Sequence, residues 1–223
     1  MKETVWIKEI LRRGTGNMLY RSESTCIVYD TVSRVHMASS SDADEAYDKL
    51  NGIELISLCT DNMVLRNRIA AKLGLRRIMD CYDMLYIGDT PIASGNKLSI
   101  RNADEFGLNL VKANYHDIDE AELDMVNARK ELYIGYDAAN NAVGFIGKQL
   151  EGSIGMLKVL DEYRGNGYGS ELEAFMINRA LSLGETAYGQ VICTNGVSLS
   201  LQQKLGLKQL EGKAYWAFLI RQQ

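Results

Sequence analysis

An arginine and three glycines separate an apolar run from a helix-forming run in the second half of the chain. The segment over 159–170 reads Val-Leu-Asp-Glu-Tyr-Arg-Gly-Asn-Gly-Tyr-Gly-Ser, so a strand over 154–160 should turn there and enter a helix. Glycine lets backbone N–H groups approach a ligand without a side-chain clash. The start of a helix adds unpaired N–H donors and the positive end of a dipole, which suits phosphate. The spacing therefore predicts a binding site for a phosphorylated ligand.

The same glycines would also fit two alternatives to a phosphate site of this kind. The first is a tight strand-to-helix turn that binds nothing. The second is the dinucleotide-binding motif Gly-x-Gly-x-x-Gly, but the sixth position counted from Gly165 is Ser170. That motif also usually opens its domain, whereas this turn follows several expected strands.

The elements around the turn predict a mixed α/β sheet, because hairpins alternate with crossover helices. In the first half we expect strands over 26–30, 34–38 and 79–87 and a helix over 42–50. In the second half we expect strands over 97–101, 133–136, 142–146, 153–160, 187–193 and 214–220, with helices over 117–130, from the glycine turn to 183, and over 197–205.

The chain also contains an internal similarity. The segment Ile-Ser-Leu-Cys-Thr-Asp-Asn over 56–62 precedes a helical run that ends in Lys-Leu-Gly-Leu at 72–75. The segment Val-Ile-Cys-Thr-Asn-Gly over 191–196 precedes a helical run with the same ending at 204–207. Gly74 and Gly206 each suit the left-handed residue that ends a helix.

This similarity predicts two copies of one fold, residues 1–95 and 96–223. The linker over 88–96 holds the only proline and two glycines. In the first copy, serines and acidic residues over 39–44 stand where the second copy has the glycine turn. We therefore expect the first copy to be structural or to shape the substrate site.

Composition excludes several classes of function. The chain has 223 residues, 46% hydrophobic and 24% charged, as in a globular protein, and its net charge of -4 gives no electrostatic case for nucleic acid. Four cysteines and two histidines show no zinc-site spacing, so we expect no metal. The N-terminus is too charged for a signal peptide, and no run approaches the ~20 apolar residues of a membrane span. We expect a cytoplasmic protein with no membrane partner.

Arg164-x-x-Gly167-x-Gly169 resembles the Arg/Gln-x-x-Gly-x-Gly/Ala signature of the GCN5-related N-acetyltransferases. The strand before it resembles the family's fourth strand, and 195–207 resembles the later Asn-x-x-Ala/Ser helix with its Leu-Gly-Phe ending. The resemblance covers residues 97–220. With the repeat, the chain is similar to a tandem member whose first copy is degenerate. The usual proline before the loop is Asp161 here.

The resemblance implies that acetyl-coenzyme A enters a gap between the family's fourth and fifth strands. Leu157 and Val159 would offer backbone hydrogen bonds to the pantetheine arm, and Asn195 would lie beside it. The pyrophosphate would be held by the N–H groups of Arg164, Gly165, Asn166, Gly167, Tyr168, Gly169 and Ser170.

Acetyl transfer to an amine needs a base that removes the ammonium proton and can use an acid at the leaving thiolate. At the positions where the resemblance expects these groups, the chain has Gln202, Gln190 and Ser153, none of which titrates. Glu151 would share a strand face with Ser153 and is our candidate base, with a solvated hairpin residue as the alternative. Tyr215 is a candidate acid, with aromatic packing on the sheet as the alternative.

Two functions follow from the resemblance. The favoured one is an N-acetyltransferase that moves an acetyl group to a primary amine of a small molecule or peptide. The alternative is a non-catalytic acyl-coenzyme A-binding sensor or regulatory module, which the missing acid and base suggest. The sequence leaves a homodimer open.

Overall fold

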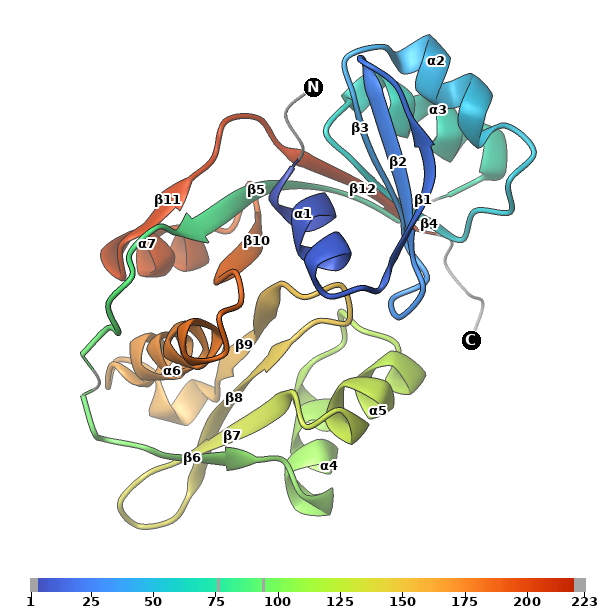
Figure 1. The fold of residues 1–223 in the computed structure, drawn as a ribbon. Coiled ribbons are helices and arrows are strands. Elements are labelled where there is room, and N and C mark those ends of the chain that lie inside the picture. Colours follow the sequence, from blue (N-terminus) through green and yellow to red (C-terminus); the bar gives the residue numbers. More distant parts are fainter. Residues whose placement is uncertain (1–3, 76, 94, 219–223) are drawn as a thin grey trace. The chain divides into compact units, whose positions relative to one another are not determined.

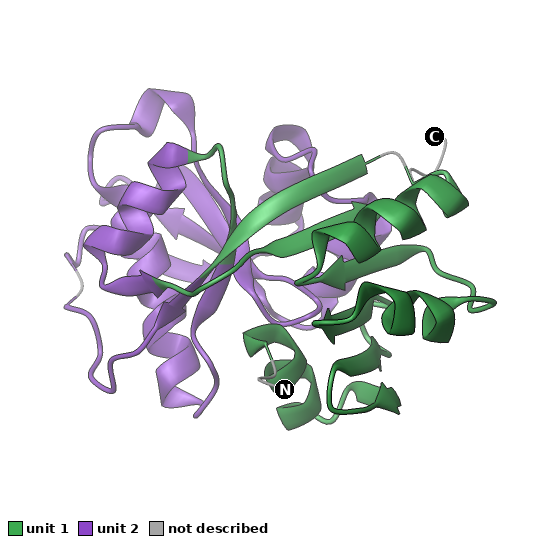
Figure 2. Cartoon of the chain, turned by 90° about the horizontal axis from the view of Figure 1, so that it is seen from above, with its two compact units in different colours: residues 1–83, 190–195, 209–223 green, residues 84–189, 196–208 purple. Residues whose placement is uncertain are grey.

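The computed structural model describes residues 4–75, 77–93 and 95–218 (Figure 1). They form two compact units (Figure 2). Unit 1 comprises Met1–Asp83, Gln190–Asn195 and Gln209–Gln223, and unit 2 comprises Met84–Gly189 and Gly196–Lys208. The units therefore differ from the sequence halves 1–95 and 96–223. Residues 190–195 and 209–223 belong to unit 1, and residues 84–95 belong to unit 2.

Unit 1 is built on a mixed sheet with the strand order β1-β2-β3-β4-β12-β5. Strands β1, β2 and β3 pair antiparallel, β3 and β4 pair parallel, and β12 lies antiparallel between β4 and β5. Helices α2 and α3 pack against each other and against the sheet. The elements are α1 (Val5–Arg12), β1 (Gly16–Arg21), β2 (Thr25–Asp30), β3 (His36–Ser40), α2 (Ala43–Leu50), β4 (Ser57–Thr60), α3 (Met63–Leu73), β5 (Arg77–Tyr86) and β12 (Ala214–Phe218).

Local signals in the sequence explain where the helices of unit 1 begin and end. Asp42 precedes α2, and its carboxylate accepts the N–H groups of Asp44 and Glu45. Asn62 caps α3 in the same way. Gly74 ends α3 in the left-handed conformation, with φ +64°, and in unit 2 Gly206 follows the helix α7 (Gly196–Lys204) with φ +90°. The predicted left-handed glycines are therefore confirmed in both positions.

Unit 2 holds the glycine turn and the strands with the order β10-β9-β8-β7-β6, except that residues 190–192 of β10 are assigned to unit 1. Strands β6 to β9 pair antiparallel, β10 pairs parallel with β9, and α6 packs on β8 and β9 (Figure 1). The elements are β6 (Ser99–Asn102), α4 (Glu105–Asn114), α5 (Glu120–Ala128), β7 (Leu132–Tyr136), β8 (Ala142–Lys148), β9 (Ile154–Val159), the 3-10 turn η1 (Asp161–Tyr163), α6 (Tyr168–Ser182), β10 (Tyr188–Ile192), α7 (Gly196–Lys204) and β11 (Leu207–Gln209). The predicted mixed α/β sheet is confirmed.

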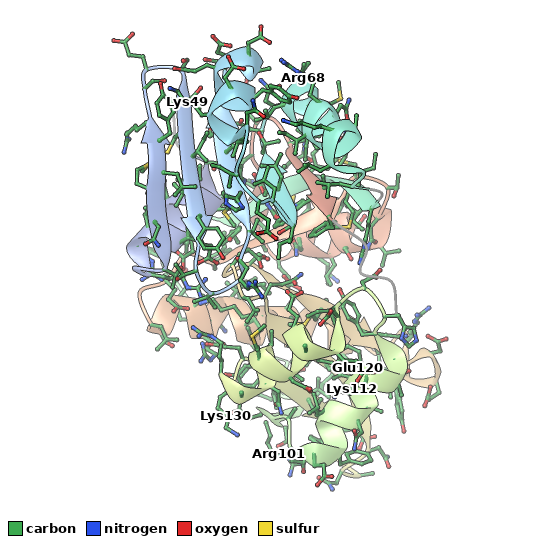
Figure 3. The ribbon with its side chains drawn as sticks, turned by 90° about the vertical axis from the view of Figure 1, so that its right-hand side faces the viewer. Lys49, Arg68, Arg101, Lys112, Glu120 and Lys130 are labelled. Carbon is green, nitrogen blue, oxygen red and sulfur yellow. The ribbon has the colours of Figure 1, made fainter. Side chains whose placement is uncertain are left out.

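Five elements were not predicted: α1, β1, α4, η1 and β11. The helix α4 contains Gly107, which argues against a helix in the sequence. In the fold, a Cβ at Gly107 would lie 2.6 Å from Ile134 Cγ1, so glycine lets the helix approach β7. Lys112 of α4 and Glu120 of α5 point toward each other, with 3.6 Å between Nζ and Oε2 (Figure 3).

The predicted strand over 214–220 is confirmed over Ala214–Phe218, and residues 219–220 lie outside the described part of the chain. None of the helices in the described ranges has the length and apolar character that a membrane crossing requires.

Candidate functional site

The glycine turn forms an exposed loop between β9 and α6 (Figure 1). Gly165 and Gly167 have φ +84° and +83°, a conformation that other residues adopt only with strain. Arg164 comes directly before these glycines, and its guanidinium forms an ion pair with the Asp161 carboxylate at 2.7 Å. The sequence therefore needs glycine at both positions to direct the chain from the strand into the helix.

The turn presents backbone donors at the start of a long helix. Gly167 is the N-cap of α6, which runs for 15 residues, and no side chain caps this end. The N–H groups of Tyr168, Gly169 and Ser170 fall in the first turn, where an α-helix offers them no carbonyl. Together with the helix dipole, these donors favour a bound anion.

Lys97 adds a positive charge to this turn, and it was not predicted from the sequence. Its Nζ donates to the carbonyl of Asn166 at 2.9 Å and would lie 3.5 Å from a Cβ at Gly167. The buried carboxylate of Glu171 fixes the lysine backbone, because it accepts the N–H groups of Lys97 and Leu98 at 3.1 and 2.9 Å. A cavity of about 140 Å³ opens beside these groups, lined in part by Gly95, Lys97, Gly167 and Ser170.

One edge of β9 is free of strand pairing over most of its length. Leu160 donates to Val143 of β8, so alternation along the strand turns the N–H groups of Leu157 and Val159 away from β8. Within the described part of unit 2, this second edge pairs only at Ile154, with Gly189 of β10. The predicted pantetheine donors therefore lie on an open edge that ends at the glycine turn.

A bulge at Met156 shapes this edge. The pairing of β8 with β9 shifts register between Phe145 and Gly147, and Met156 has φ +55°. A bulge sets two residues of one strand against one of its partner and bends the strand. Gly147 makes room for it, because a Cβ there would collide with Met156 Cε.

Glu151, the candidate base, is buried rather than solvated, so its hairpin-surface alternative is wrong. Its carboxylate accepts the hydroxyl of Ser153, and its carbonyl accepts the Tyr188 hydroxyl at 3.4 Å. Gln202 is buried as well and donates to the carboxylate of Glu173 on α6 at 3.0 Å. A carboxylate that was not predicted from the sequence therefore lies beside Gln202.

Unit 1 contains a second titratable group that was not predicted. Asp83 of β5 is buried, and its two oxygens accept Gln190 Nε2 at 2.9 Å and Trp6 Nε1 at 3.2 Å. Gln190 in turn accepts Trp216 Nε1 at 2.8 Å. Burial raises the pKa of Asp83 from its ordinary 3.8 to about 6, although both hydrogen bonds lower it. This carboxyl group can therefore exchange a proton near neutral pH.

Tyr215 and Asn195 belong to unit 1. The ring of the half-buried Tyr215 lies under the guanidinium of Arg66, 5.5 Å from its centroid, and Arg66 pairs with Asp80 at 3.0 Å. This contact favours the packing role over an acid. Asn195 is exposed directly before α7, and its N–H donates to the Ile192 carbonyl at 2.8 Å.

Residues 133–217 match the model of a protein family described as FR47-like protein. Solved structures of several proteins share the fold, and three of them are described next. A Drosophila protein has a TM-score of 0.65 at 19% identity over 87% of this chain and 74% of its own. A GCN5-related N-acetyltransferase-like protein from Streptococcus suis has a TM-score of 0.59 at 14% identity over 97% and 93%. A GCN5-related N-acetyltransferase from Kribbella flavida has a TM-score of 0.58 at 12% identity over 96% and 93%.

The likeness to these structures shows the fold of the GCN5-related N-acetyltransferases, as the glycine turn predicted. A sequence search of curated proteins gave no match.

Proposed function

We propose that the protein is an N-acetyltransferase that moves an acetyl group from acetyl-coenzyme A to a primary amine of a small molecule or peptide. The observation that carries this proposal is the joining of the open edge of β9 to an uncapped helix start through two left-handed glycines. The match of residues 133–217 to the FR47-like model covers the same elements and supports it.

The residues of unit 2 suit the two ends of such a ligand. The N–H groups at the start of α6 and the Lys97 ammonium would hold the pyrophosphate. The outward N–H groups of Leu157 and Val159 would hold and orient the arm along β9. Acetyl-coenzyme A supplies an activated acyl group when it is bound. Catalysis by these groups is largely a matter of positioning, because the thioester is already reactive toward a neutral amine.

We assign the proton-accepting role to Glu151, which belongs to unit 2 with the open edge of β9. It lies between β8 and β9, and its carboxylate accepts the Ser153 hydroxyl, which would hold it in place. A carboxylate in this position can take a proton from an ammonium group.

Release of thiol from acetyl-coenzyme A tests the enzyme against the non-catalytic alternative. The protein is offered a panel of primary amines and peptides, and free thiol is measured with time. Amine-dependent release above the protein-free rate is the expected result. Background rates across the panel, with retained binding of coenzyme A, would favour the sensor or regulatory module.

We also propose that the chain is a tandem of two related copies. In each copy an antiparallel hairpin leads to a helix, a parallel neighbouring strand and a second helix: β2-β3-α2-β4-α3 and β8-β9-α6-β10-α7. Only the second copy has the glycine turn. In the first, Asp42 caps the helix with its own carboxylate, so the donors an anion would need are already occupied.

Removal of the Lys97 ammonium should weaken binding of coenzyme A. In Lys97→Ala we expect a dissociation constant raised about tenfold, because an exposed charge contact contributes modestly, with a smaller dependence on salt. Calorimetric titration at low and high salt measures both effects. Lys208→Ala removes an equally charged exposed side chain and should leave both unchanged. A salt dependence as steep as that of the wild type would contradict this role of Lys97.

A further inference from the structure

A buried polar pair joins α6 to α7 and is not used by the roles assigned above. Gln202 Nε2 donates to Glu173 Oε1 at 3.0 Å. The two residues are only 5% and 2% exposed, in a region where the neighbouring helix positions Leu172, Met176 and Ile177 are apolar and buried. Charged side chains are rarely buried without a specific partner, so this pair calls for a physical reason.

The second atom of the Gln202 amide lacks a partner. Oε1 is buried, and no described residue donates a hydrogen bond to it. Buried acceptors are nearly always satisfied, so an unpaired one calls for an explanation, and a donor on a bound ligand would supply the missing partner. The Glu173 carboxylate sets this orientation, because an ionised carboxylate accepts only, and so it turns Nε2 toward itself and leaves Oε1 free.

The amide lies where the open edge of β9 begins. A Cβ at Gly189 would lie 3.0 Å from Gln202 Nε2, 3.5 Å from its Oε1 and 3.1 Å from the carbonyl of Ile154. Gly189 and Ile154 form the pair of β10 with β9, and beyond them the edge of β9 is open as far as the glycine turn. An arm that starts at a pyrophosphate on that turn and follows β9 therefore ends near Gln202. In coenzyme A, the far end of this arm carries the sulfur.

We propose that Gln202 Oε1 accepts a hydrogen bond from the free thiol of coenzyme A, and that Glu173 is the positioning residue that keeps this oxygen available. The inference rests on the proposed binding of coenzyme A along β9. It adds a preference for the unacylated cofactor over forms whose sulfur carries no hydrogen. The free thiol would then compete with acetyl-coenzyme A, so the product of the transfer would inhibit the enzyme.

The ionised state of Glu173 is the form that the proposal uses. Burial raises the pKa of Glu173 to about 7, and the hydrogen bond from Gln202 lowers it. No charged neighbour contributes to this shift among the described residues. Binding is therefore compared at pH 8, where the ionised form predominates.

Calorimetric titrations with coenzyme A and with its S-methyl derivative test the proposal. The wild type should bind the free thiol roughly two- to threefold more tightly, the lower end of the net effect of one hydrogen bond, because an S–H group is a weak donor. Gln202→Met should reduce this ratio to one, whereas Gln203→Met, an exposed change on the same helix, should preserve it. Glu173→Gln should also lower the ratio, because a carboxamide can donate to Oε1 as well as accept from Nε2.

The outcomes separate this inference from the function on which it rests. Equal affinities for the two ligands in the wild type would overturn the inference and leave the proposed cofactor intact. An unchanged ratio in Gln202→Met would do the same. A ratio that falls in Gln202→Met and not in Glu173→Gln would overturn the role of Glu173. Failure of both ligands to bind would refute the proposed function itself.

Discussion

Gly167→Glu should raise the dissociation constant of coenzyme A at least about a hundredfold. The substitution places a carboxylate at the helix start where the pyrophosphate should lie, beside Lys97 Nζ, which is 3.5 Å from the new Cβ. The carboxylate would neutralise that ammonium and repel the phosphates, and opposed like charges cost several kcal/mol in recognition. A thermal shift with saturating coenzyme A, supported by calorimetry, measures the loss.

Gly184→Glu is the matched control for this substitution. Gly184 follows the other end of α6 with φ +65°, and its missing Cβ would meet nothing within 4 Å. Both variants thus introduce a glutamate in the left-handed conformation, at a cost of about 1–3 kcal/mol. The control should lose a similar amount of stability and retain its affinity. Tight binding by Gly167→Glu would show that the phosphates lie elsewhere.

Glu151→Gln should lower kcat/KM for the acceptor by about 10²- to 10⁴-fold, the usual effect of losing a general base. Glu151 lies in unit 2 with the open edge of β9, and its carboxylate accepts the Ser153 hydroxyl. The rate is measured with acetyl-coenzyme A saturating, so that only the amine step is compared.

Glu162→Gln is the control, since it removes an exposed carboxylate of unit 2. It should keep the wild-type kcat/KM, and an unaltered kcat/KM in Glu151→Gln would exclude Glu151 as the base.

Asp83→Asn should change how the stability of the protein depends on pH. The pKa of Asp83 is higher in the folded chain, so its contribution to the free energy of unfolding is full below 3.8 and is lost as the pH rises through about 6. Denaturant unfolding over this pH range should show the decline in the wild type and not in the variant.

The glycine turn could be predicted from sequence because its requirements are local. The φ values of Gly165 and Gly167 and the start of the helix that follows depend on neighbouring residues. Periodicity and turn chemistry report such local needs. The same reasoning located the left-handed ends at Gly74 and Gly206.

The groups that could titrate were missed because the fold brings them together from distant positions. Asp83 meets Gln190 across 107 residues, and Glu173 meets Gln202 across 29. Lys97 was missed for a similar reason, because its partner Asn166 lies 69 residues away. A charged residue within a buried run, as Glu173 is, was the one signal available in the sequence.

Calorimetric titration of the unmodified protein with coenzyme A is the decisive experiment for a cofactor site at the glycine turn. We predict saturable binding at one site per chain, with stabilisation of about 2.7 kcal/mol when the ligand stands at a hundredfold excess over its dissociation constant. Dephospho-forms that keep the pyrophosphate should still bind, whereas pantetheine alone should bind far more weakly. Absence of both binding heat and thermal stabilisation at millimolar coenzyme A would contradict the proposed site.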